Sequence, residues 1–137
     1  MSTPKENLTE LQQSAFIKVL MPERKGYGYE KENPIEVPSP YEQIEFIRSA
    51  LPDYEGITNA HLIEGVRTGS LDAKGRLGLI DEYELAYAYT KNGQPYAELF
   101  VIYFSFYPKE GESQMDFLYR VTHNSIKYPE GLKNIKK

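Results

Sequence analysis

The side chains that most often act as nucleophiles or general bases are scarce in this sequence. Its 137 residues contain no Cys and two His, His61 and His123. No Ser lies in a Gly-x-Ser-x-Gly nucleophile elbow, and no motif groups a Ser with a His and an acid. The absence of Cys also excludes a disulfide scaffold, an iron–sulfur cluster and Cys-ligated zinc. The sequence therefore predicts no catalytic residue, no metal site and no cofactor.

One short segment has the residue types of an anion site. Arg67-Thr68-Gly69-Ser70 combines a guanidinium, a hydroxyl and a Gly that lets backbone N–H groups approach a ligand. It lacks the Gly-rich loop and Lys of a phosphate-binding P-loop, so the structural interpretation is a strand end with Gly69 at a bulge or turn. Arg67 and Ser70 remain the candidate anion-binding residues.

Two carboxylates are spaced to share a ligand. Glu82 and Glu84 lie two residues apart in a predicted strand and so project from one face, about 7 Å from each other. A divalent cation needs more ligands, and neither a nearby His nor an Asp-rich calcium loop supplies them. We expect a solvated sheet face or edge here rather than a metal site.

Acidic residues gather in one part of the chain. Residues 29–55 hold seven acidic and two basic side chains. A solvated surface explains this pattern, and a docking surface for a basic partner is the functional alternative, since complementary charge raises association rates. The candidate partner-binding residues are Glu30, Glu32, Glu36, Tyr41, Glu42 and Glu45.

Tyrosine is the second conspicuous residue type, with 12 copies. Tyr83, Tyr87 and Tyr89 alternate along one predicted strand, and Tyr103 and Tyr107 share a face of the next. Cross-strand aromatic pairing explains them structurally, whereas a pocket on the sheet lined by Tyr83, Tyr87, Tyr103 and Phe104 is the functional alternative.

Helical periodicity is confined to the first third of the chain. Leu8, Leu11, Ala15 and Val19 recur at spacings of three and four, which predicts a helix that starts at Pro4 and continues until Pro22 and Gly26 end it. A second helix is expected from Pro40 to Leu51, with Ile44, Ile47 and Leu51 on its buried stripe. The Gly- and Pro-rich residues 26–40 between them predict an ordered surface loop.

The rest of the chain alternates with a period of two. Strands are expected from His61 to Thr68, from Leu77 to Thr90, from Tyr96 to Tyr107 and from Asp116 to Thr122. Asn92-Gly93 predicts a tight hairpin between the second and third of these. The expected fold is α+β, in which two N-terminal helices pack on one face of a four-stranded antiparallel β-meander.

Length and charge limit the remaining possibilities. We expect a single domain over residues 1–137, with a basic, frayed tail at residues 127–137 whose net charge of +3 offsets a body at −7. An acidic body argues against nucleic-acid binding, and no signal peptide or membrane-spanning run is evident, so a cytoplasmic location is expected.

These observations favour a non-catalytic protein-binding domain. It would use its acidic loop and helix against another protein, for which a basic surface is the complementary match, as an inhibitor or immunity-type protein that occludes its target does. Self-association through the sheet is a further possibility. A small-ligand-binding domain with a Tyr-lined pocket, with or without weak enzymatic turnover, is the alternative.

Overall fold

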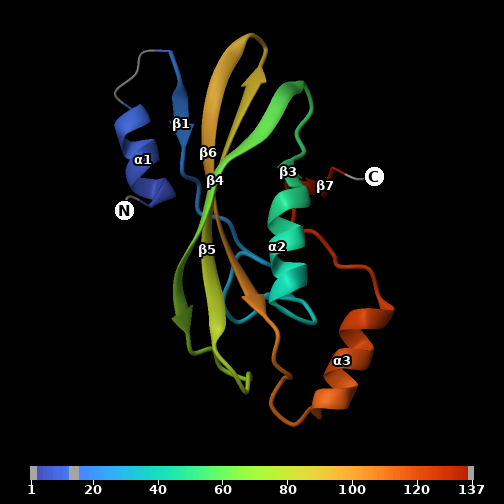
Figure 1. Ribbon diagram of the computed structural model, residues 1–137. Helices are drawn as coiled ribbons and strands as arrows, with labels where there is room; N and C mark the ends of the chain where they lie inside the picture. The colour runs from blue at the N-terminus through green and yellow to red at the C-terminus, as the bar shows by residue number, and fades with distance from the viewer. Residues whose placement is uncertain (1–2, 13–15, 136–137) are drawn as a thin grey trace.

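The computed structural model describes residues 3–12 and 16–135 of the chain. Within these residues, three helices and a mostly antiparallel sheet form a mixed α+β fold (Figure 1). The helices are α1 (Pro4–Leu11), α2 (Pro40–Ser49) and α3 (Gln114–His123). The strands of the main sheet are β1 (Lys18–Leu20), β2 (Ile35–Glu36), β4 (Ile57–Leu71), β5 (Ile80–Lys91) and β6 (Gln94–Ser105), and a separate pair joins β3 (Ala50–Pro52) to β7 (Leu132–Asn134).

The long strands β4, β5 and β6 form the antiparallel part of the sheet. The Asn92-Gly93 hairpin is confirmed, because both residues have positive φ angles, 52° and 78°, between the end of β5 and the start of β6. β6 is a central strand as expected: β5 pairs with one edge, and β1 and β2 pair in parallel with the other.

The first helix is much shorter than its periodicity predicts. α1 starts as expected, with Thr3 accepting a hydrogen bond from the Glu6 backbone N–H in a capping box. It ends at Leu11, and Lys18–Leu20 is strand β1 rather than helix, because these residues complete the edge of β6. Ala15, which the predicted apolar stripe included, lies outside the described residues.

The helices do not share one face of the sheet. Leu8 of α1 packs with Ala86, Ala97 and Leu99, whereas Phe46 and Ile47 of α2 belong to the cluster on the opposite face. That larger cluster includes Tyr83, Leu85, Tyr87, Phe100, Ile102 and Phe104. Figure 1 shows α1 and α2 on opposite sides of the sheet. The expected packing of both helices on one face was therefore wrong.

The fourth predicted strand is a helix. Residues 116–122 lie within α3, where Phe117 and Val121 are buried one turn apart and the Ser113 side chain accepts from the Asp116 backbone N–H. The pattern Phe117, Tyr119, Val121 fits a period of two, but a spacing of four between the two buried residues fits a helix equally well. Tyr119 is exposed although it lies between these two buried residues, so the helical period applies and not the period of a strand.

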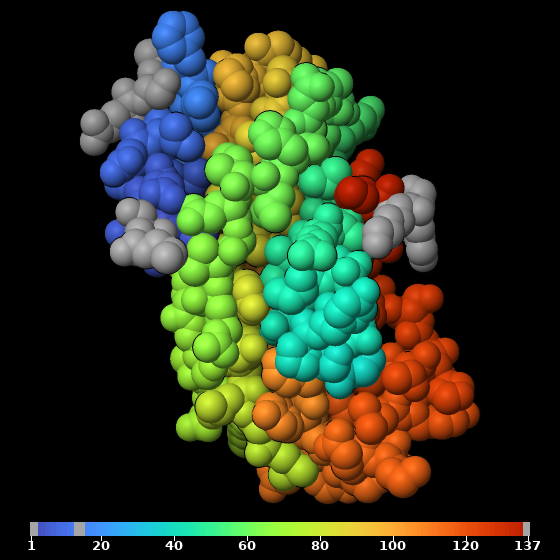
Figure 2. Space-filling view, viewed as in Figure 1, coloured from blue at the N-terminus to red at the C-terminus, as the bar shows by residue number. Residues whose placement is uncertain are grey.

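The segment predicted as a frayed tail is packed over most of its length. Tyr128 stacks on Phe46 with ring centroids 4.5 Å apart, Leu132 is buried, and β7 pairs with β3. Figure 2 shows this C-terminal segment beside α2. The lysines made the segment appear solvated, but its apolar side chains complete the core on the α2 side of the sheet.

Candidate functional site

The tyrosines of β5 lie in the core rather than on an open surface. Tyr87 is fully buried and meets Phe100 edge to face, with ring centroids 5.6 Å apart. Tyr83 meets Phe104 in the same way, and Tyr89 stacks on Tyr96. Because α2 and the segments around it cover this face, these three side chains fill the space that the expected ligand pocket would have needed.

Glu98 organises a buried polar cluster on the same face. Its carboxylate pairs with the Arg24 guanidinium and accepts hydrogen bonds from the hydroxyls of Tyr89, at 2.7 Å, and Tyr54, at 2.9 Å. Burial, together with the Glu98 charge, raises the pKa values of both tyrosines. The carboxylate is thus satisfied by neighbours within the protein, which is typical of a structural group.

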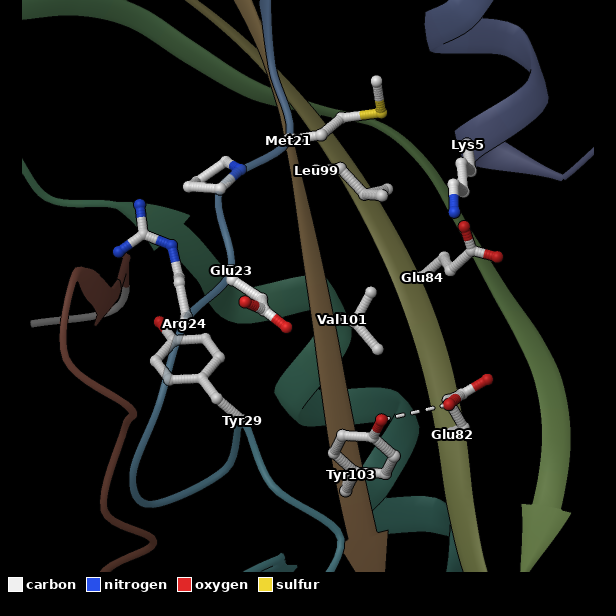
Figure 3. Close-up of a pocket in the computed structure, with 11 residues that line it drawn as sticks. Lys5, Met21, Glu23, Arg24, Tyr29, Glu82, Glu84, Leu99, Val101 and Tyr103 are labelled. Carbon is white, nitrogen blue, oxygen red and sulfur yellow. Dashed lines mark hydrogen bonds between the residues drawn. The ribbon is translucent and has the colours of Figure 1, made fainter.

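Tyr103 faces the opposite side of the sheet and lines a hollow of about 720 Å³, which we call the outer hollow. Leu99 and Val101 of β6 lie beside Tyr103, Glu82 and Glu84 of β5 form one wall, and Met21, Glu23 and Lys5 lie around them (Figure 3). The hollow exists because β1 and β2 leave a gap along β6. β1 pairs with residues 96–98 and β2 with residues 104–105, and the chain between them returns to β6 at Tyr103, whose N–H donates to the Gly28 carbonyl.

The two glutamates of the outer hollow differ in their partners. Glu82 accepts hydrogen bonds from Thr68, at 2.8 Å, and from the Tyr103 hydroxyl, at 3.1 Å. Burial and the bond to Glu82 raise the pKa of Tyr103 to about 12. Glu84 was expected on a solvated face but is only 9% exposed, and its Oε1 atom has no hydrogen-bond partner among the described residues.

A second hollow, of about 400 Å³, lies between the N-terminal half of α2 and the ends of β4, β5 and β6. We call it the α2 hollow. It brings together four predicted site residues that are far apart in the sequence, namely Arg67, Ser70, Tyr83 and Tyr107. Sequence reasoning had assigned these residues to two unrelated sites.

An internal carboxylate occupies the expected anion site. Ser70 donates a 3.1 Å hydrogen bond to Oδ1 of Asp81, and Arg67 Nη1 lies 3.6 Å from the same oxygen. The ladder between β4 and β5 shifts register between Arg67 and Gly69, which bears out the bulge. Arg67 and Ser70 therefore meet at Asp81, which already supplies the negative charge.

The rim of the α2 hollow is apolar and exposed. Ile44, Leu79 and Tyr107 line it with 40%, 48% and 44% of their surface exposed. The Tyr107 ring packs on Gly78, where an added Cβ would lie 2.1 Å from the ring. Sequence reasoning missed Ile44 and Leu79, since Ile44 fits the helical stripe that was assigned to the core.

The candidate acidic residues do not form one uniform patch. Glu36 is tied to Arg76 and Arg120, and the Glu30 carboxylate accepts from the Gly26 backbone N–H. Glu32 and Tyr41 are exposed. Glu42 and Glu45 lie on α2, where Glu42 accepts from the Ser39 hydroxyl and Glu45 lies 3.7 Å from Arg48. Tyr41, Glu42 and Glu45 are thus the members of the predicted acidic surface that share an element with the α2 hollow.

The two histidines make local contacts. His61 Nδ1 lies 2.8 Å from the Asn59 carbonyl oxygen, and His123 Nδ1 lies 2.9 Å from that of Tyr119. Within residues 3–12 and 16–135, no three His, Asp or Glu side chains are grouped so that they could hold a metal ion. No helix in this part of the chain is long and apolar enough to cross a membrane.

Comparisons with models of protein families, with curated proteins and with solved structures give no match for this chain. The geometry of the two hollows and the nearby charges therefore indicate the function.

Proposed function

We propose that this protein is a non-catalytic protein-binding domain whose partner docks on the α2 hollow. The observation that carries the proposal is the convergence of Ile44, Leu79 and Tyr107, all substantially exposed, on one concave site. Exposed apolar side chains around a hollow are typical of protein interfaces, where a partner's anchor side chain fills the concavity and loses its water.

The charge around the hollow favours a basic partner. Glu42 and Glu45 lie on α2, where they line a separate cleft with Ser49 and Tyr128 rather than the hollow. Tyr41 is exposed on the same helix. Arg67 and Asp81 within the hollow neutralise each other. A partner that places an apolar anchor in the hollow and extends Lys or Arg across α2 to Glu42 and Glu45 therefore matches this surface, and its association would be accelerated by the unlike charges.

An inhibitor or immunity-type protein is one form of this function. Such a protein has only to cover its target, so it needs a rigid complementary surface and no reacting group. The α2 hollow is built on the ends of three long paired strands and on a helix, which gives it the required rigidity.

Site-directed photo-crosslinking in the producing cells tests the proposal. A photoreactive residue at Tyr41 is expected to crosslink to a second protein. The same residue at Lys91, exposed at the end of β5 away from the hollow, is expected not to. Once the partner is purified, Ile44→Ser and Leu79→Ser should raise its dissociation rate at least tenfold. Crosslinks of equal yield from both positions would refute the proposal.

Salt dependence tests the predicted sign of the partner's charge. Glu42→Lys with Glu45→Lys should slow association with the purified partner, and raising the salt concentration should slow association of the wild-type protein. Light scattering of the protein alone distinguishes self-association. A crosslink from Tyr41 that joins only two copies of this chain would identify a dimer and contradict a separate partner.

A further inference from the structure

The outer hollow combines an apolar floor with an excess of negative charge. Leu99 and Val101 form the floor, and Figure 3 shows the carboxylates of Glu23, Glu82 and Glu84 arranged around it. Two cationic side chains also line the hollow, but the Arg24 guanidinium is already paired with Glu98. Among the described residues that line the hollow, Lys5 is the remaining positive charge against three carboxylates, and its charge acts on Glu84.

The Glu84 side chain is the strongest indication of a missing partner. It is 9% exposed, it lines the hollow, and Oε1 has no hydrogen-bond donor among the described residues. Buried carboxylate oxygens are almost always paired, because an unpaired one loses its hydration without compensation. Burial raises the pKa of Glu84, and the charges of Glu82 and Glu6 add to that rise, while a hydrogen bond from the Lys5 backbone and the charge of Lys5 oppose it.

A metal ion fits this environment poorly. Within the described residues no cluster has the three or more acidic or imidazole ligands that a metal would need. The Glu82 carboxylate already accepts hydrogen bonds from Thr68 and Tyr103, and these two donors orient it toward neighbours in the protein. The aliphatic floor, by contrast, offers surface that an organic group can cover.

We propose that the outer hollow binds a small organic cation, an aliphatic ammonium compound whose charged group lies at Glu84 and Glu82 and whose apolar body covers Leu99 and Val101. An ammonium group donates up to three hydrogen bonds and so supplies a donor to the unpartnered Oε1 atom of Glu84. A volume of about 720 Å³ accommodates a ligand of this kind. The hollow lies on the face of the sheet opposite α2, so this inference is independent of partner binding at the α2 hollow.

Nuclear magnetic resonance of the full chain tests the inference, with hexylamine, which is protonated at neutral pH, as the probe. The methyl resonances of Leu99 and Val101 are expected to shift saturably with hexylamine. Hexan-1-ol and hexanoate keep the apolar body and replace the charged group, so they should bind at least tenfold more weakly. An equal affinity for hexan-1-ol, or no saturable shift with hexylamine, would overturn the inference.

Single-residue variants test which carboxylate binds the ammonium group. Glu84→Gln keeps the shape of the side chain and removes its charge, so the affinity for hexylamine should fall about tenfold. Glu55→Gln changes the net charge equally at an exposed position outside the hollow and should leave the affinity unchanged. Glu23→Lys, also at an exposed position, places an ammonium group inside the hollow and should abolish binding even if Glu84→Gln fails to fold. Wild-type affinity in Glu84→Gln or Glu23→Lys would refute the assigned site.

Discussion

Arg24 and Glu98 form an ion pair inside the layer between the sheet and the segments that cover it, although 74 residues separate them in the chain. Glu98 is almost fully buried, and the Arg24 guanidinium lies over the Phe100 ring, 4.5 Å from its centroid. The pair therefore fixes the loop after β1 to the centre of β6. It also holds one wall of the outer hollow in place, since Arg24 lines that hollow.

Removing one member of this pair should be strongly destabilising. In Arg24→Met the Glu98 carboxylate stays buried without a cation, and we expect a loss of about 3–5 kcal/mol in the free energy of unfolding, measured by urea denaturation. The double variant Arg24→Met with Glu98→Met removes both charges and should recover much of that loss. A single variant within about 1 kcal/mol of the wild type would contradict the structural role.

The cluster around Arg120 predicts how stability depends on pH. Arg120 Nη2 lies 2.8 Å from Glu36 and 2.9 Å from Glu112. The hydrogen bond from Arg120 lowers the pKa of Glu112 to about 2. Burial raises the pKa of Glu36, but hydrogen bonds from Arg120 and Arg76 outweigh it and leave the pKa below its ordinary value.

Both carboxyl groups have lower pKa values when folded than when unfolded. Their contribution to stability is therefore complete above the ordinary value of 4.5 and is lost as the pH falls toward about 2. Urea denaturation at a series of pH values should show this decline in the wild type. The free energy of unfolding should fall less steeply with decreasing pH in Arg120→Met. An identical pH dependence in both proteins would exclude the cluster as its source.

The two faces of α2 give a direct test of which side is buried. Ile47 packs in the core and Ile44 lies on the rim of the α2 hollow. Ile47→Ala should lower the free energy of unfolding by about 2–4 kcal/mol, whereas Ile44→Ser should change it by less than about 1 kcal/mol. Equal losses in thermal or urea unfolding would mean that Ile44 is also a core residue.

The sequence correctly predicted the elements whose conformation depends on residues that are close together in the chain. The Asn92-Gly93 turn needs positive φ at two adjacent residues, and few residue types allow it, so the hairpin could be recognised. β6 was recognisable because both its faces are apolar over many residues. In these cases no distant partner was required to choose between alternatives.

Elements decided by distant contacts were predicted less well. The α2 stripe was misassigned because Gln43, a polar residue, is buried where it bonds to Asp81 and Tyr83, about 40 residues away. The β1 segment is a strand because the edge of β6 is available for pairing. The outer hollow likewise depends on where residues 21–24 return to the sheet, which no local pattern indicates.

In the C-terminal segment, the charge of the residues and their packing lead to opposite predictions about stability. Leu132 is buried in the core cluster and lies on β7, while the adjacent Lys133 is exposed and its Nζ atom is 3.7 Å from Asp53. Leu132→Ala should therefore lower the free energy of unfolding by about 2–4 kcal/mol. Lys133→Ala removes an exposed ion pair and should change it by less than about 0.5 kcal/mol.

The same segment also contributes a specific polar contact. The Tyr128 hydroxyl lies 2.6 Å from the Ser49 hydroxyl, next to the ring that stacks on Phe46. Tyr128→Phe keeps the stacked ring and should lower stability by about 1 kcal/mol, less than Leu132→Ala. If Leu132→Ala and Lys133→Ala unfolded at the same urea concentration as the wild type, residues 127–135 would be solvated as their charge first indicated, and β7 would not stabilise the fold.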